Sequence, residues 1–245
     1  MILCELVPRE KKQLMDESMY ITKTFPLISG INIPDVLRLK IRSYDAASFL
    51  LNENITPIPH IRAMDLPLNK TVKVVESLYK NGLRSVLIVT GDIPTSLSVK
   101  IFPVTPLHII ESLKKKCPKL TVYAAIDPYR DSFQNEFSYA KQKINAGCDG
   151  FFTQPFFDPK LASIYCEQLS HSTLFIGISP VTSETSKNYW ITRNKAIFPK
   201  EFKLNFEYNI QLAKKIMAIA EEHKQHTYLM PIKVNPINYL ERLFF

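Results

Sequence analysis

The sequence predicts a single (β/α)8 barrel over residues 1–245, a closed ring of parallel strands covered by helices. Two observations support this α/β fold. Short β-branched or aromatic runs alternate with longer amphipathic runs from end to end, and eight such pairs fit into 245 residues. Continuous apolar strands separated by helices indicate a parallel sheet that is buried on both faces. An open, doubly wound sheet is the second candidate, because periodicity does not show whether a sheet closes.

Eight segments have the composition of buried strands. They are 2–6, 26–31, 56–61, 85–90, 121–126, 150–154, 173–179 and 227–233. Helical patterns lie between them, of which 33–54 and 131–147 are the clearest examples. Gly147 is predicted to follow the second of these helices as the residue after its C-cap.

The composition is that of an ordinary globular protein, with 46% hydrophobic and 22% charged residues. No apolar run reaches the roughly 20 residues that a bilayer span requires. The first residues reach a charge at Glu5 without the apolar core of a secretory signal, so we expect a cytoplasmic protein with no membrane partner. The four cysteines and five histidines show no metal-ligand spacing, so free thiols and no metal site are expected.

The net charge of +8 is spread over several lysine-containing helical segments. Solvated helix faces explain this pattern best, and attraction of an anionic small molecule is the next explanation. No pattern typical of a nucleic-acid-binding module is present, so no nucleic-acid partner is expected. None of the six glycines forms GxGxxG or a P-loop, so a nucleotide-like cofactor would need another kind of site.

Polar residues end nearly every predicted strand. In chain order they are Glu5, Asn32, His60, Asp92, Asp127, Gln154, Ser179 and Lys233. Each alone has an ordinary explanation, and Asn32 and Asp127 are interpreted as turn or cap residues. Because barrel enzymes place their catalytic groups at the carboxyl ends of the strands, the acids, imidazole and amide together outline a reaction site.

Five motifs resemble one known family. They are ELVPRE (5–10), PIPHI (57–61), VLIVTGDIP (86–94), NAGCDGFFTQPFFD (145–158) and GISPVTSETSKNYW (177–190). In this order, and across nearly the whole chain, the sequence resembles the methylenetetrahydrofolate reductase family. The block around Gln154 and the Thr-Gly-Asp turn are the most specific pieces.

The resemblance implies a flavin-dependent barrel that reduces 5,10-methylenetetrahydrofolate to 5-methyltetrahydrofolate with NADH or NADPH. Glu5 corresponds to the family's acid, and Asp92 to an aspartate near both flavin and folate. Gln154 corresponds to the glutamine that binds the pterin. Trp190 stands where the family has a phenylalanine that packs on bound substrate.

The chemistry agrees with these implied roles. Ring opening of the folate produces a cationic iminium, so an acid such as Glu5 can supply a proton if burial raises its pKa. A fixed carboxylate at Asp92 can stabilise the cation, and the carboxamide of Gln154 offers both a donor and an acceptor to a pterin. The four phenylalanines around Gln154 are expected to serve mostly as packing.

The resemblance assigns the FAD contacts to His60, Thr90, Gly91, Asp92, Ala124 and Lys143. His60 has an equally good interpretation as a core histidine hydrogen-bonded to a neighbouring loop. The dinucleotide end departs from the family pattern, because Thr90 replaces a common arginine and Ile126 replaces a tyrosine. In the helix before the sixth strand the matching positions are Glu136, Tyr139, Gln142 and Lys143, of which only Lys143 is retained.

These departures leave two alternatives open beside an FAD-dependent reductase. One is a reductase on the same barrel that transfers hydride without a flavin. The other is a non-catalytic folate-binding or partner subunit. The sequence also leaves the oligomeric state open, including a homo-oligomer.

Overall fold

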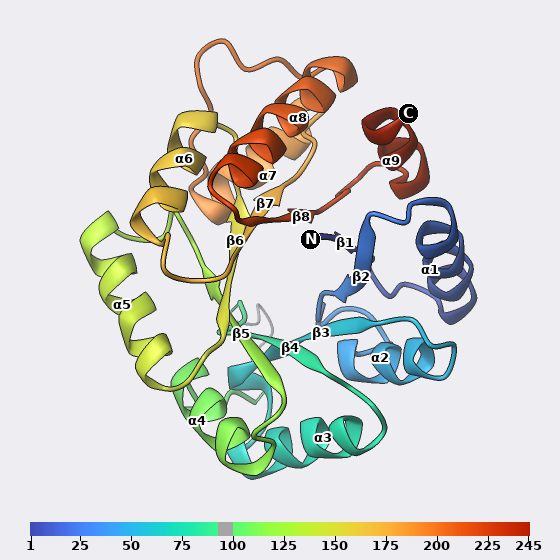
Figure 1. The fold of residues 1–245 in the computed structure, drawn as a ribbon, viewed down its shortest axis with the longest axis vertical. Coiled ribbons are helices and arrows are strands. Elements are labelled where there is room, and N and C mark those ends of the chain that lie inside the picture. Colours follow the sequence, from blue (N-terminus) through green and yellow to red (C-terminus); the bar gives the residue numbers. More distant parts are fainter. Residues whose placement is uncertain (93–99) are drawn as a thin grey trace.

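The structure, a computed structural model, describes residues 1–92 and 100–245. Eight parallel strands close into one barrel in chain order, so the predicted closed ring is confirmed and the open sheet is excluded (Figure 1). The strands are β1 Ile2–Glu5, β2 Ile28–Ile33, β3 Pro57–Arg62, β4 Ser85–Val89, β5 Thr121–Ile126, β6 Gly150–Pro155, β7 Leu174–Ile178 and β8 His226–Leu229. Closure is made by β1 and β8, where Ile2 lies beside Thr227 and Cys4 beside Leu229.

Helices surround this ring on all sides in Figure 1. In the described part of the chain they are α1 Lys11–Thr24, α2 Ser43–Leu51, α3 Leu68–Lys80, α4 Pro106–Lys116, α5 Phe133–Asn145, α6 Pro159–Gln168, α7 Glu184–Asn194, α8 Phe206–Glu222 and α9 Pro236–Phe244, with a short 3-10 turn at Ala63–Asp65. Side-chain N-caps begin several of them, such as Ser132 before α5 and Asn205 before α8. Gly147 follows the C-cap of α5 with φ +102°, as predicted.

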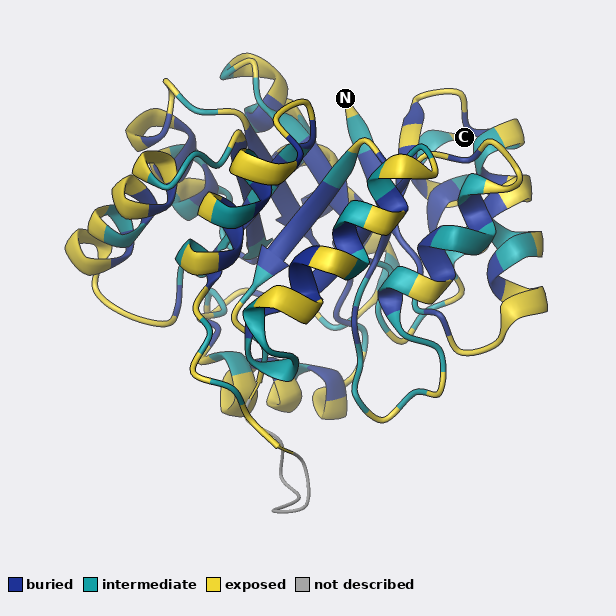
Figure 2. Ribbon diagram, turned by 90° about the horizontal axis from the view of Figure 1, so that it is seen from below, coloured by how far each residue is buried: buried dark blue, intermediate teal, exposed yellow. Residues whose placement is uncertain are grey.

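Alternation along the strands divides the core into two layers. Side chains that point into the barrel form a small interior cluster of Leu3, Ile58, Leu87, Phe152, Phe175, Tyr228 and Met230. The intervening residues pack outward against the helices in a much larger cluster. Figure 2 shows the resulting distribution, with buried strands inside and exposed outer helix faces. Because strand side chains alternate with period 2, Glu5 and His60, which follow the interior residues Leu3 and Ile58 by two positions, also point into the barrel, nearer its carboxyl end.

Most predicted boundaries differ from the observed ones by a few residues at most, and two were wrong by more than three residues. Strand β8 ends at Leu229 rather than 233, because Pro231 has no N–H for a ladder and Lys233 adopts φ +59°. The helix predicted over 33–54 is helical only from Ser43, because Ile33 still belongs to β2 and Pro34 follows it directly.

All four cysteines are free thiols, as expected from their spacing. Among the described residues, no helix is long and apolar enough to cross a membrane. Nor do three or more His, Cys, Asp or Glu side chains of the described residues come together in a group that could hold a metal ion.

Candidate functional site

Three polar side chains form the layer above the interior cluster at the ends of β1, β2 and β3. Glu5 and Asn32 are neighbours in the β1–β2 register, and the Asn32 Nδ2 atom lies 3.4 Å from His60 Nε2. Asn32 is fully buried and lies within β2, so its interpretation as a turn residue was wrong. Residues two positions earlier on β1 and β3, Leu3 and Ile58, belong to the interior cluster, which explains why the polar residues point inward.

Glu5 is a buried acid paired with a buried phenol. The Tyr228 hydroxyl, contributed by β8, donates a hydrogen bond to Glu5 Oε2. Burial raises the pKa of Glu5 from 4.5 to about 7, even though the hydrogen bond from Tyr228 acts in the opposite direction. Burial also lowers the pKa of His60 to about 4, so His60 is neutral at physiological pH.

A cavity of about 170 Å³ opens beside Glu5. Its walls come from the segment between β1 and α1, from α1 itself, and from the segment between β8 and α9. The polar residues that line it are Glu5, Arg9, Gln13, Glu17 and Asn235. Glu5 therefore lines a space that a small polar group can enter.

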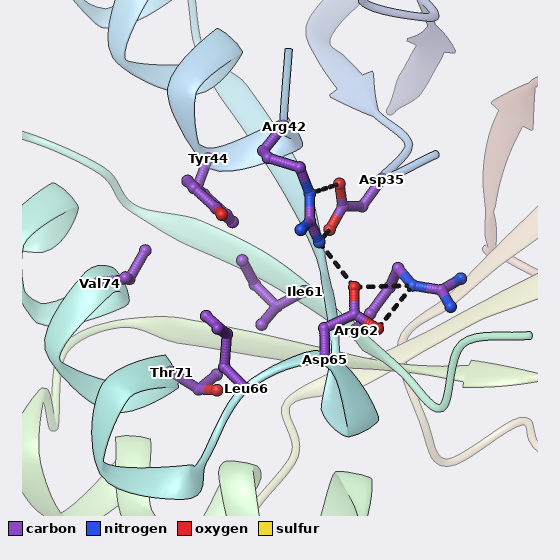
Figure 3. A pocket seen from close by; sticks show the side chains of 9 residues that line it. All are labelled: Asp35, Arg42, Tyr44, Ile61, Arg62, Asp65, Leu66, Thr71 and Val74. Atoms are coloured by element: carbon purple, nitrogen blue, oxygen red, sulfur yellow. Dashed lines mark hydrogen bonds and ion pairs between the residues drawn. The ribbon is translucent and has the colours of Figure 1, made fainter. Parts of the chain in front are cut away.

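A chain of charged side chains lies at the same end of β3. Asp35 and Arg42 form a two-point ion pair, with Arg42 Nε 2.8 Å from Asp35 Oδ1, and Arg42 Nη2 lies 2.6 Å from Asp65 Oδ2 (Figure 3). Asp65 in turn accepts from Arg62 Nε at 3.0 Å. Because Asp35, Asp65 and Arg62 are each less than a tenth exposed, this network holds the segments after β2 and β3 in one arrangement.

Arg62 extends the network to the turn after β4. Its Nη2 atom donates to the Asp92 backbone carbonyl at 2.6 Å. Gly91 has φ +89°, and a Cβ atom built there would lie 2.8 Å from Arg62 Cζ. Thr90 and Asp92 are exposed, and the residues that follow, 93–99, lie outside the described part of the chain.

Gln154 lies near the end of β6 and is half-buried. The pairing of β6 with β7 is irregular between Phe152 and Pro155, and Thr153 Oγ1 accepts from the Gly177 amide there. The four phenylalanines around Gln154 are all buried, which confirms their packing role. They are Phe151, Phe152, Phe156 and Phe157.

Trp190 lies on α7 with only 3% of its surface exposed. Its ring packs edge-on against the ring of Phe157, with 5.6 Å between the two ring centroids. The indole Nε1 atom has no hydrogen-bond partner among the described residues. The arrangement thus gives Trp190 a place in the core, and its contact with a substrate stays a prediction.

The residues assigned to the dinucleotide end are engaged within the protein. Lys143 Nζ donates to the Ala125 carbonyl at 2.6 Å and lies 4.0 Å from the centre of the Tyr139 ring. Glu136 accepts from the Asp127 amide and forms an ion pair with Arg130. Burial lowers the pKa of Lys143 to about 8. The Lys143 ammonium group is therefore already engaged in a hydrogen bond to an internal carbonyl.

Two further details concern β5. Ala124 packs in the outer core, so only its backbone could meet a cofactor at the barrel end. Asp127 accepts from the Tyr129 amide through Oδ1, which confirms its interpretation as a turn residue.

Two buried oxygens without partners test whether a flavin ring fits this site. Asn32 Oδ1 and Ser179 Oγ, at the ends of β2 and β7, have no hydrogen-bond partner in the described structure. Buried polar atoms of this kind need an explanation, and a heteroaromatic ring with N–H and C=O edges would supply the missing partners once the side chains that cover these oxygens made room for it. The ring end of a flavin therefore fits the residues present, whereas the pyrophosphate end finds no free cation at Lys143.

Sequence reasoning missed Arg62, Tyr228 and the carboxylates Asp35 and Asp65. The available signal was the period of 2, because Arg62 follows His60 by two positions on the same strand. For Tyr228, the burial of a phenol opposite Glu5 depends on barrel closure, which no local pattern shows.

The fold and the site together define the class of protein. It is a (β/α)8 barrel with a buried acid at the carboxyl end of its strands, where enzymes of this fold carry their chemistry.

Comparison with known proteins identifies the family. The methylenetetrahydrofolate reductase family model matches residues 18–229, and the chain therefore belongs to the methylenetetrahydrofolate reductase family. Glu5 lies before the matched range. A curated relative, 5,10-methylenetetrahydrofolate reductase of Buchnera aphidicola subsp. Schizaphis graminum (strain Sg), is 27% identical over 105 residues. That alignment covers 42% of this chain and 36% of the relative, about a third of its length.

Solved structures confirm the fold alone. A 2,3-dimethylmalate lyase of the PEP mutase/isocitrate lyase superfamily has a TM-score of 0.60 at 9% identity, covering 95% of this chain and 75% of that one. An oxaloacetate acetylhydrolase has a TM-score of 0.61 at 10% identity, covering 99% and 88%.

Proposed function

We propose that this protein reduces 5,10-methylenetetrahydrofolate to 5-methyltetrahydrofolate with electrons from NADH or NADPH, through bound FAD. Membership of the family supports the substrate and the reaction. The single observation that carries the proposal is Glu5, a buried carboxyl with a pKa of about 7 that faces a cavity at the barrel end.

Glu5 serves as the proton donor for opening the folate's five-membered ring. A carboxyl with an ordinary pKa is almost wholly ionised at pH 7 and holds no proton to give. With a pKa near 7, about half of the Glu5 side chains are protonated at that pH. Ring opening leaves a cationic iminium carbon, which then accepts hydride.

Asp92 and Gln154 are proposed to bind the reacting folate. The Asp92 carboxylate stabilises the cation, and its backbone is fixed by Arg62. The Gln154 carboxamide offers one donor and one acceptor to the pterin edge. Trp190 is proposed to border the substrate from α7.

FAD, when bound, supplies the hydride and regains it from the nicotinamide. His60, Asn32, Thr90 and Gly91 would hold its ring end. His60 is neutral and can donate through one ring nitrogen without adding positive charge. Lys143 and the backbone of Ala124 are the residues proposed for the dinucleotide end, where Lys143 would have to give up its bond to Ala125.

One observation favours a second candidate, a reductase that uses no flavin. Lys143, the cation proposed for the pyrophosphate, already donates to an internal carbonyl, so binding of the pyrophosphate is less well supported than binding of the ring end. In this second candidate reaction the nicotinamide transfers hydride directly to the iminium carbon, and the role of Glu5 is unchanged.

The test begins with the absorption spectrum of the purified protein after reconstitution with excess FAD. A flavin spectrum and NAD(P)H-dependent formation of 5-methyltetrahydrofolate are expected. Folate reduction without any flavin spectrum would select the second candidate. Absence of folate reduction both with and without added FAD would refute the proposed activity and leave a folate-binding subunit.

Glu5→Gln then tests the proton donor. Folate reduction should fall by roughly 10²–10⁴-fold, while nicotinamide oxidation by an artificial acceptor stays unchanged because it needs no such proton. Glu10→Gln is the matched control, since Glu10 is an exposed carboxyl at the start of α1. Equal slowing of both half-reactions by Glu5→Gln would show that Glu5 is structural.

A further inference from the structure

Glu5 is held by a partner that the proposed chemistry does not use. The Tyr228 hydroxyl donates to one carboxyl oxygen, Oε2, and both side chains are buried. Within the described residues, the other oxygen, Oε1, receives no hydrogen bond from any side chain or backbone group. The two oxygens of this acid are therefore not equivalent.

The Tyr228 ring is itself fixed by its neighbours. The Phe152 ring packs edge-on against it with 5.1 Å between the ring centroids, and the centroid of the His60 ring lies 6.3 Å from that of Tyr228 in a similar orientation. Tyr228 belongs to the interior cluster of the barrel. Its hydroxyl therefore has a defined position, and a carboxyl that accepts from it loses rotational freedom about its last bond.

We infer that Tyr228 is a positioning residue for Glu5, which ties Oε2 to the barrel interior and leaves Oε1 as the oxygen that carries the exchangeable proton to the cavity. This inference rests on the proposed role of Glu5. In the balanced step, the O–H bond at Oε1 breaks, the proton forms an N–H bond on the folate amine, and a carboxylate remains. The hydrogen bond from Tyr228 stabilises that carboxylate, which makes release of the proton easier.

The other groups near Glu5 do not perform this task. Cys4 is its chain neighbour, and burial raises the pKa of that thiol, which keeps it neutral. Arg9 and Glu17 line the same cavity from the β1–α1 segment and from α1. His60 contacts the Tyr228 ring and is neutral because burial lowers its pKa to about 4. None of them has a hydrogen bond to the Glu5 carboxyl in the described structure.

Tyr228→Phe isolates the hydroxyl, and Tyr239→Phe is the matched control. Tyr239 is a fully buried phenol on α9 whose hydroxyl has no partner among the described residues. The first readout needs neither substrate nor cofactor. Infrared difference spectroscopy follows the protonated carboxyl band that Glu5→Gln removes, as a function of pH. We expect a midpoint near 7 in the unmodified protein and in Tyr239→Phe, and a midpoint about one pH unit higher in Tyr228→Phe.

The second readout is the pH profile of folate reduction. Tyr228→Phe should lower kcat at pH 7 about tenfold with KM changed less than about twofold, and should move the alkaline limb to higher pH with the infrared midpoint. In the Glu5→Gln background, Tyr228→Phe should change the residual rate by less than about twofold, because the carboxylate it stabilises is gone.

An unchanged midpoint in Tyr228→Phe, or a lower kcat with an unmoved pH profile, would overturn the inference. If the unmodified protein reduced no folate, the proposed function would fail, and the infrared titration would still decide whether Tyr228 and Glu5 are paired.

Discussion

Replacing Gly91 by alanine should destabilise the protein far more than the same change at Gly82. Both glycines have positive φ, +89° and +103°, so an alanine at either position adopts a backbone that L-residues disfavour. That strain costs about 1–2 kcal/mol. At Gly82 no atom lies within 4 Å of an added Cβ, so the strain is the whole effect expected.

At Gly91 the added carbon also meets Arg62, at 2.8 Å from Cζ. The guanidinium must move, although it is held by Asp65 at 3.0 Å and by the Asp92 carbonyl at 2.6 Å. Hydrogen bonds to charged groups contribute about 1.5–3 kcal/mol each, and at least one is lost. The total expected for Gly91→Ala is therefore about 2.5–5 kcal/mol.

Urea unfolding measures these free energies, with circular dichroism and the fluorescence of the single, buried Trp190 as probes. In an Arg62→Ala background the clash is absent, so Gly91→Ala should cost only about 1–2 kcal/mol there. Equal losses at Gly91 and Gly82, within about 0.5 kcal/mol, would refute the account of Arg62 as a rigid brace for the turn.

Two further predictions concern the site. Burial raises the folded-state pKa of Glu5 from 4.5 to about 7, so this group's contribution to stability is fully present below pH 4.5 and is lost as pH rises through 7. Each pH unit in that interval corresponds to about 1.4 kcal/mol. The free energy of unfolding of Glu5→Gln should therefore rise by about 3 kcal/mol relative to that of the unmodified protein between pH 4.5 and 8. For the control Glu10→Gln this difference should not change with pH, and the same constancy for Glu5→Gln would contradict the prediction. Gln154→Leu should raise the folate KM by the equivalent of about 1–3 kcal/mol with little change in nicotinamide oxidation, whereas Gln211→Leu on the exposed face of α8 should change neither; steady-state kinetics with both substrates decides it.

The barrel could be predicted because its signals are local. Each strand is a short apolar run and each helix an amphipathic one, and their regular alternation leaves few topologies. The strand period of 2 predicts that Glu5 shares a face with Leu3 and that His60 shares a face with Ile58. Only the structure shows that this face points into the barrel, because both faces of these strands are buried. The helix end at Gly147 is equally local, because glycine accepts the positive φ that the cap requires.

Predictions failed where a nearby proline or a distant partner decided the outcome. Asparagine is common in turns, but the pairing of Asn32 with β1 and β3 keeps it in β2. The long helix expected over 33–54 is shortened to Ser43–Leu51 because Pro34 ends the strand and the following segment folds around the Asp35–Arg42 pair. Tertiary contacts overrode local propensity at Asn32. At the predicted helix over 33–54, Pro34 is itself a local signal against helix at its start, and the prediction overlooked it.

The sequence by itself determined the order of the elements, the end of the barrel that carries the polar residues, and the resemblance to a family. Only the tertiary structure decided which of those residues meet. Glu5 and Tyr228 are 223 positions apart, and barrel closure between β1 and β8 brings them into contact. The same closure decides their electrostatics, because a pKa depends on how much water is removed from around a group, and that is a property of all the elements packed around it.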